Sequence, residues 1–167
     1  MPLLAILLGI AGLIPFVVCG LGAMSVDPTL AARMMTALIG YSAVILSFLG
    51  GVHWGFALGG GAPVPAVADA STANRFLTAE RGRLGLGVVP PLIGWLALLL
   101  QMSLLEWAAL LVLIAGFIAT VVVEHQASRR MLLLPVGYVW LRWGLTIVVT
   151  AMLVTVVTVR LLGRHIY

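Results

Sequence analysis

Five long apolar segments, separated by shorter polar ones, run along this chain. They cover approximately residues 3–21, 34–58, 84–100, 107–123 and 137–162. Their lengths are near the roughly 20 residues that a helix needs to cross the hydrocarbon core of a bilayer. A helix also satisfies its own backbone hydrogen bonds, as lipid requires. We therefore predict an all-α fold, in which residues 1–167 form a single integral membrane bundle of five transmembrane helices.

The first apolar segment contains a proline, Pro15, which lacks a backbone N–H. The carbonyl of Ala11, four residues earlier, then loses its helical partner, and the helix is expected to bend. The segment starts without lysine or arginine and is longer than the apolar part of a typical signal peptide. We interpret it as a helix that is retained in the mature protein.

The second apolar segment carries a small residue at every fourth position. These residues are Ala43, Ser47, Gly51, Gly55 and Gly59. Residues four apart lie on one helix face, and small residues let another helix approach closely in lipid. We therefore predict that these five residues form a helix-packing face. His53 and Trp54 lie on nearly the opposite face, close to one end of the segment.

The longest connection follows this segment and extends to about residue 83. We predict a polar loop there, with a weak signal for a short interfacial helix over residues 70–76. The next apolar segment contains Pro90 and Pro91, which leave the carbonyls of Leu86 and Gly87 without helical partners. Membrane helices tolerate such carbonyls where protein or water satisfies them.

The last apolar segment has a polar residue at every fourth position. These residues are Tyr138, Arg142, Thr146 and Thr150. An arginine near the centre of a membrane helix costs about 2.5–3.5 kcal/mol on insertion scales. We therefore expect the stripe to face the bundle, with Arg142 paired to Glu124. The alternative is that Arg142 extends outward to the interface beside Trp140 and Trp143.

An up-and-down topology places the polar and helix-breaking residues of four segments in one leaflet. They form a predicted ligand-binding cluster of His53, Trp54, Pro90, Pro91, Glu124, Tyr138 and Arg142. His53, the two prolines and Arg142 are expected about 9–12 Å below the surface, from a rise of 1.5 Å per residue. We expect His53 to bond a freed carbonyl or Tyr138. Ionisable residues inside a membrane are candidates for function, although such pairs also serve simply to hold a bundle together.

Composition supports the membrane class and excludes several functions. The chain is 63% hydrophobic and 8% charged, whereas soluble domains carry about 25% charged residues. The net charge of +4 comes from scattered arginines, so nucleic-acid binding is not expected. The single cysteine, Cys19, allows no disulfide framework.

No pattern of catalytic residues is present, so we predict that the protein is not an enzyme. His53 and His125 are conceivable axial ligands of a haem, but His125 is predicted to lie in a connector rather than inside a helix. A metal site would need a third ligand, for which Glu124 is the obvious candidate. We predict no catalytic residue, no metal site and no cofactor.

Three motifs resemble one known family. The central motif is Leu46-Ser47-Phe48-Leu49-Gly50-Gly51-Val52-His53-Trp54-Gly55, and the others are Gly12-Leu13-Ile14-Pro15-Phe16 and residues 135–146. They resemble the transmembrane-protein-69-like family, whose bacterial members carry a domain of unknown function (number 3429). In the last motif Gly137 stands where the family tends to have an aromatic residue. The resemblance implies a small integral membrane protein of bacteria and mitochondria and supplies no reaction.

These observations give one leading hypothesis and one alternative. The leading hypothesis is a non-enzymatic accessory, assembly or stabilising subunit of a larger membrane complex, with lipids and other membrane subunits or further copies of itself as partners. The alternative is a binding protein or carrier for a small amphipathic or anionic ligand, such as a quinone or a lipid headgroup. The distribution of arginines predicts an inner-membrane protein with a cytoplasmic amino terminus.

Overall fold

The computed structural model describes residues 3–59, 70–131 and 136–163, and the side chains of residues 5, 53, 55–59, 70–84, 86, 127–131 and 136–139 lie outside that description. Every regular element in the described ranges is a helix, which confirms the all-α prediction. The helices are α1 (Leu3–Ala11), α2 (Ile14–Ala23), α3 (Pro28–Gly59), α4 (Ala70–Met102), α5 (Glu106–Met131) and α6 (Val136–Gly163).

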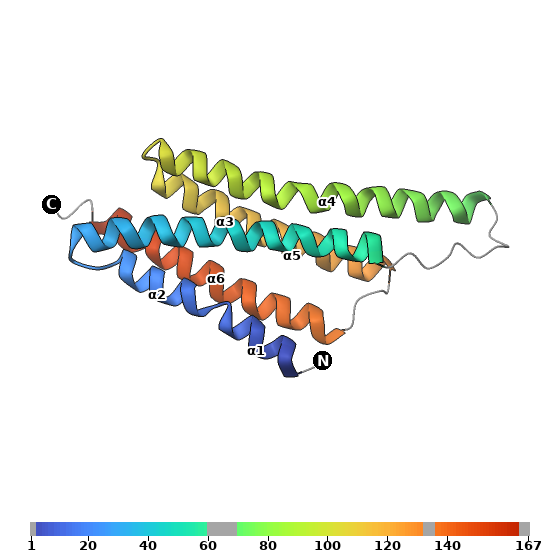
Figure 1. Cartoon of the computed structure of the whole chain (residues 1–167), viewed down its shortest axis with the longest axis horizontal. Helices are drawn as coiled ribbons and strands as arrows, with labels where there is room; N and C mark the ends of the chain where they lie inside the picture. The colour runs from blue at the N-terminus through green and yellow to red at the C-terminus, as the bar shows by residue number, and fades with distance from the viewer. Residues whose placement is uncertain (1–2, 60–69, 132–135, 164–167) are drawn as a thin grey trace.

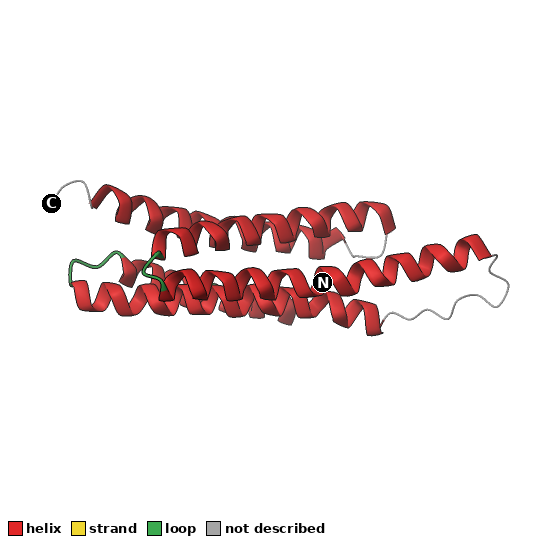
Figure 2. Cartoon of the chain, turned by 90° about the horizontal axis from the view of Figure 1, so that it is seen from above, coloured by secondary structure: helices red, strands yellow, loops and turns green. Residues whose placement is uncertain are grey.

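The helices run up and down along one long axis (Figures 1 and 2). The amino terminus and the start of α6 lie at one end of the bundle. The two described loops, at residues 24–27 and 103–105, lie at the other end, as does the carboxyl terminus. Helix α3 packs along α2, α4 and α5, whereas α6 packs along α5 and α2. The carboxyl ends of α3 and α5 therefore lie at the amino-terminal end of the bundle, where we predicted the polar residues.

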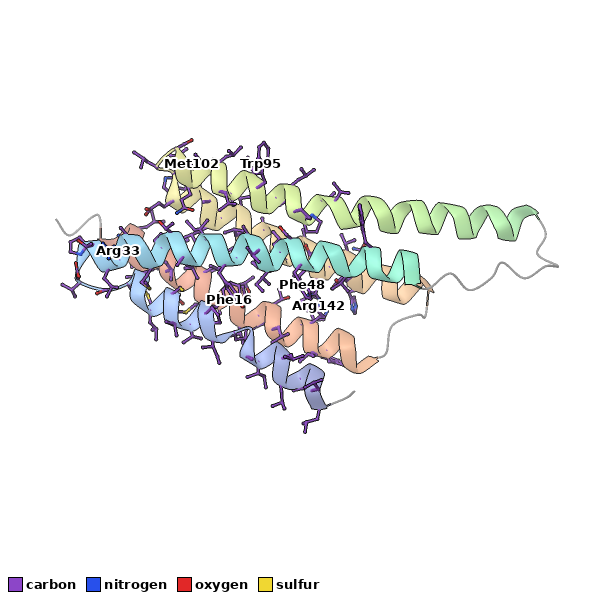
Figure 3. All side chains as sticks on the ribbon, viewed as in Figure 1. Phe16, Arg33, Phe48, Trp95, Met102 and Arg142 are labelled. Atoms are coloured by element: carbon purple, nitrogen blue, oxygen red, sulfur yellow. The ribbon has the colours of Figure 1, made fainter. Side chains whose placement is uncertain are left out.

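Four stretches of the described chain are long and apolar enough to cross a membrane. They are Ile6–Ala23, Pro28–Val52, Glu106–Gln126 and Trp140–Gly163. The remaining predicted span falls in the second half of α4, which contains the apolar stretch Gly87–Met102. The surface of the bundle agrees with a lipid environment: Trp95 and Met102 project outward from α4 (Figure 3), and both are largely exposed.

The first span is broken at Gly12 and Leu13, just before Pro15, as the proline predicted. The Tyr41 hydroxyl on α3 donates a hydrogen bond of 2.9 Å to the Gly12 carbonyl. Phe16 follows the break and is fully buried, with its ring 5.0 Å from that of Tyr41 and 6.1 Å from that of Phe117. An aromatic cluster thus holds the kinked span against α3 and α5 (Figure 3).

Two predicted connections are helical instead. The polar loop expected up to about residue 83 is wrong beyond residue 69, because α4 starts at Ala70 and continues without interruption past Pro90 and Pro91. Its amino-terminal part extends beyond the ends of the other helices (Figure 1). Likewise α5 continues to Met131, so the connector that we expected from about Glu124 is helical as well. The polar composition of these two segments predicted where the apolar spans end, but α4 and α5 continue beyond those points.

Helices α3 and α4 approach most closely at their glycines. A Cβ built on Gly94 would lie 3.0 Å from the Ala43 carbonyl oxygen. A Cβ on Gly50 would collide with the carbonyl oxygen of Gly87 and would lie 2.7 Å from Cδ of Pro91. Because Pro91 has no N–H, the Gly87 carbonyl is one of the two that the prolines free from the α4 ladder. It lies against the Gly50 backbone, where Cα–H···O contacts between membrane helices are common.

Of the predicted packing face, Ala43 is buried against Gly94, whereas Gly51 packs against no described residue of this chain. Gly51 is exposed, and no described atom lies within 4 Å of a Cβ built on it. A helix turns about 100° per residue, so each step of four advances the face by about 40°. After two steps the ladder has left the contact, and Gly50 takes the place of Gly51. Ser47 is half-buried and donates to the Ala43 carbonyl; the side-chain surroundings of Gly55 and Gly59 lie outside the described residues.

The two adjacent glycines provide a matched test of this contact. We expect Gly50→Ala to destabilise the protein by about 1–3 kcal/mol, the usual result of overpacking, because the Gly87 carbonyl and Pro91 leave no room for a methyl group. Gly51→Ala adds the same atom in open space and should leave stability unchanged or slightly raised. Thermal unfolding in detergent, followed by circular dichroism, measures both. Equal melting temperatures for the two variants would contradict the packing described here.

Candidate functional site

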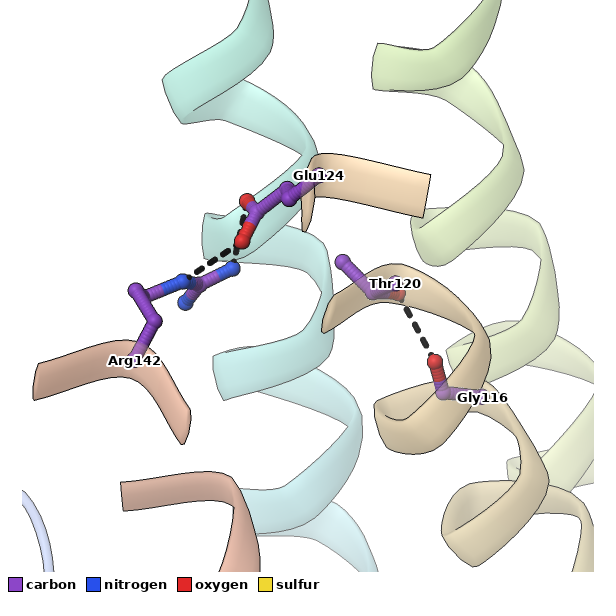
Figure 4. Close-up of polar contacts among 4 residues, drawn as sticks. All are labelled: Gly116, Thr120, Glu124 and Arg142. Atoms are coloured by element: carbon purple, nitrogen blue, oxygen red, sulfur yellow. Dashed lines mark hydrogen bonds and ion pairs between the residues drawn. The ribbon is translucent and has the colours of Figure 1, made fainter. Parts of the chain in front are cut away.

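A buried ion pair joins α5 to α6 (Figure 4). The Arg142 Nε donates to Oε2 of Glu124 at 2.8 Å, and Nη2 donates to Oε1 at 2.6 Å. This two-point geometry is the strongest that an arginine and a carboxylate form. Glu124 is 7% exposed and Arg142 is 9% exposed. The predicted pairing is confirmed, and Arg142 does not extend outward to the interface.

The polar stripe of α6 faces the bundle together with Arg142. Thr146 is buried one turn further along, and Thr150 donates to the Thr146 carbonyl at 2.7 Å. On α5 the buried Thr120 donates in the same way to Gly116 at 2.7 Å (Figure 4). The hydroxyls of Thr120 and Thr150 are satisfied within their own helices, and among the described residues Glu124 and Arg142 make the hydrogen-bonded contact between α5 and α6.

A second contact lies directly beside the ion pair. His125 follows Glu124 on α5, and Trp143 follows Arg142 on α6. Their rings meet edge to face, with centroids 6.0 Å apart and planes at 83°. His125 lies inside a helix, so the reason we gave against it as a haem ligand, its place in a connector, does not hold. Within the described ranges no three His, Cys, Asp or Glu residues group to hold a metal ion.

The predicted cluster divides between two separate seams. Trp54, Pro90 and Pro91 belong to the α3–α4 seam, where a Cβ on Gly87 would collide with the Trp54 ring. Glu124 and Arg142 belong to the α5–α6 seam. Helix α4 packs along α3 and α5, whereas α6 packs along α5 and α2. The described members of the cluster therefore lie on two helix contacts, α3–α4 and α5–α6, and α3 itself packs along α5. The side chains of His53 and Tyr138 lie outside the described residues.

Several residues that position these seams were missed in the sequence. Tyr41 closes the broken first span, and Gly50 and Gly87 bring α3 and α4 together. A signal existed for two of them. Gly50 lies seven residues after Ala43, two helical turns away on the same face, and Gly87 lies four residues before Pro91, where a carbonyl is freed. Nothing in the sequence pointed from Tyr41 to Gly12.

The Glu124–Arg142 pair limits what the site can bind. The two charges are opposite, and Arg142 lies six residues after the start of α6. An arginine has five N–H donors, of which Glu124 accepts two. Three guanidinium N–H groups are left for another acceptor, which must approach beside the Glu124 carboxylate.

Comparison with known proteins gives two matches. Residues 1–158 match the family described as "Protein of unknown function (DUF3429)". Transmembrane protein 69 from Xenopus tropicalis is 39% identical over 112 residues, which make up 67% of this chain and 39% of that protein. The matched part of the chain therefore spans about two fifths of that relative's length. No solved structure matches the chain.

Removing one member of the buried pair should be costly. Glu124→Leu leaves the Arg142 guanidinium buried without its carboxylate, and we expect a loss of about 3–5 kcal/mol in the free energy of unfolding. The double variant Glu124→Leu with Arg142→Met should recover most of this loss, because an apolar pair of similar volume often replaces a buried ion pair without penalty.

Glu106→Leu is the matched control, since Glu106 starts the same helix and lies 4.0 Å from the half-exposed Arg160. A surface pair of this kind contributes about 0–1 kcal/mol. Denaturant unfolding in mixed micelles measures all three variants. If Glu124→Leu and Glu106→Leu had the same small effect, Arg142 would not depend on its partner.

Proposed function

The chain belongs to the DUF3429 family, whose function is unknown, and is related to transmembrane protein 69. We propose that it is a non-enzymatic accessory subunit that assembles with or stabilises a larger membrane complex. Its apolar helices make it a multi-pass membrane protein. The proposal rests on a surface that packs against no other described helix of the chain.

This surface is the outer face of α3, and we call it the small-residue face. It comprises Gly40, Val44, Ser47 and Gly51, whose spacing of four, three and four keeps them on one side of the helix. A Cβ on Gly40 or Gly51 meets no described atom within 4 Å, and Val44 is 64% exposed. In lipid, a face of this kind allows the backbone of another helix to approach closely.

The polar requirements of the small-residue face are already met. The Ser47 hydroxyl donates to the Ala43 carbonyl at 2.8 Å, so the face presents an apolar, shallow surface to lipid. On the opposite side, α3 buries Leu38, Leu46 and Ala43 in the core of the bundle. One side of α3 therefore holds this chain together, and the other side suits a helix of another subunit or a second copy.

We expect Gly51→Leu to remove this association without unfolding the chain. The leucine fills the groove that the partner helix needs, while the monomer has free space at that position. Gly144→Leu is the control, because Gly144 on α6 is also exposed and a Cβ there meets no described atom. Each variant is purified in mild detergent, and the stoichiometric partner is identified by native mass spectrometry.

The expected result is a partner, or a second copy, with the wild type and with Gly144→Leu, and at least a tenfold loss with Gly51→Leu. A wild-type chain that is monomeric and alone in several mild detergents would overturn the proposal. So would equal association of the two variants.

We also propose that the protein lies in the inner membrane with its amino terminus in the cytoplasm. Arg75, Arg81, Arg83, Arg129 and Arg130 belong to the side of the amino terminus, whereas Arg33, Arg160 and Arg164 belong to the other side. Positively charged connections stay in the cytoplasm. The two chain ends lie at opposite ends of the bundle (Figure 1), consistent with an odd number of crossings.

Reporter fusions test this orientation. Alkaline phosphatase joined to the carboxyl terminus should be active, because the enzyme folds only outside the cytoplasm, and green fluorescent protein at the same place should be dark. The reverse pattern would show that the modest excess of arginines does not set the topology.

A further inference from the structure

We infer that the α5–α6 seam beside the Glu124–Arg142 pair binds the uncharged, carbonyl-bearing head of an amphipathic molecule from the bilayer. This role is separate from lateral assembly through α3, since the two surfaces share no residue. Three features of the seam carry it: a buried histidine nitrogen without a partner, arginine donors that Glu124 leaves unused, and the Glu124 carboxylate beside them.

The histidine nitrogen is Nδ1 of His125. It is buried and has no hydrogen-bond partner within the described part of the chain. The ring is fixed by its edge-to-face contact with Trp143. Native proteins pair the large majority of their buried side-chain polar atoms, and an exception calls for an explanation. A group that enters from outside the chain supplies the missing partner.

The unused donors belong to Arg142. Glu124 accepts from Nε and from one N–H of Nη2, which leaves three of the five N–H groups. These three N–H groups bond to no other described residue. Unlike His125 Nδ1, no Arg142 nitrogen is both fully buried and without a hydrogen-bond partner. The Arg142 side chain retains 11% of its surface. Three N–H groups of Arg142 are therefore left for an acceptor that enters the seam.

The Glu124 carboxylate selects the kind of head. It lies against the Arg142 guanidinium and repels a phosphate that approaches the same donors. A neutral carbonyl oxygen accepts from a guanidinium without this repulsion. The Nδ1 atom of His125 donates to a second carbonyl or accepts from a hydroxyl, according to the ring tautomer.

The position of the seam suits such a molecule. Glu124 and His125 begin the polar stretch that leads to Arg129 and Arg130 on α5, and Arg142 lies six residues after the start of α6 at Val136. This is the boundary between acyl chains and headgroups, where the carbonyls of glycerolipids lie and where a quinone ring can rest. Both molecules share the carbonyl chemistry, and the experiment separates them.

The experiment uses the full chain in detergent and three probes: a short-chain benzoquinone, a short-chain diacylglycerol and a short-chain phosphatidylglycerol. Quenching or enhancement of tryptophan fluorescence reports binding, because Trp143 contacts His125. We expect saturable binding of one uncharged probe, the benzoquinone or the diacylglycerol, and at least tenfold weaker binding of the anionic lipid.

His125→Phe keeps the ring contact with Trp143 and removes the nitrogen, and should weaken binding about tenfold, as expected for one lost hydrogen bond. Gln126→Leu is the matched control, because Gln126 is the next residue and is exposed; binding should not change. Arg142→Lys keeps a positive charge beside Glu124 but has fewer donors, and should also weaken binding about tenfold. It tests the site independently if His125→Phe does not fold.

Three results would overturn the inference. The first is no saturable binding of either uncharged probe, and the second is a preference for the anionic lipid. The third is equal affinity of the wild type and of a folded His125→Phe or Arg142→Lys variant, which would leave a water molecule as the partner of His125. None of these results bears on assembly through the small-residue face.

Discussion

Hydrocarbon offers no hydrogen bonds, so the polar groups of a membrane helix take their partners from the protein or from a bound molecule. Most of the structure follows from this constraint. The buried hydroxyls of Ser42 and Thr120 return to carbonyls four residues earlier. Where the first span breaks, Tyr41 reaches across from α3 to the Gly12 carbonyl. At the α5–α6 seam the two opposite charges, Glu124 and Arg142, pair with each other.

The same constraint explains where prolines are placed. Pro15 lies at the start of α2, just after the break at Gly12 and Leu13, where Tyr41 of α3 donates to the Gly12 carbonyl. Pro91 lies within α4, and the carbonyl that it frees at Gly87 faces the bare backbone of Gly50. A side chain on Gly50 would push this carbonyl away. Proline and glycine on neighbouring helices therefore act as one packing unit.

The proposed functions use two surfaces with opposite chemistry. The small-residue face of α3 is apolar, shallow and free of unmet hydrogen bonds, and it suits another helix. The α5–α6 seam is polar, with a buried nitrogen at His125 that has no described partner. A membrane subunit can carry both, since assembly and binding of a lipid-phase molecule place different demands on different helices.

The sequence by itself determined the membrane class, the apolar spans, the break at Pro15 and the Glu124–Arg142 pair. Each follows from local hydropathy, from the missing N–H of proline, or from the cost of an unpaired charge in lipid. Only the tertiary structure decided that Gly50 rather than Gly51 packs on α4, and that the predicted cluster divides between two seams. Lipid is as apolar as leucine, so hydrophobic periodicity does not encode which faces meet. The order of helices around the bundle depends instead on shape and on the few polar contacts that cross between helices.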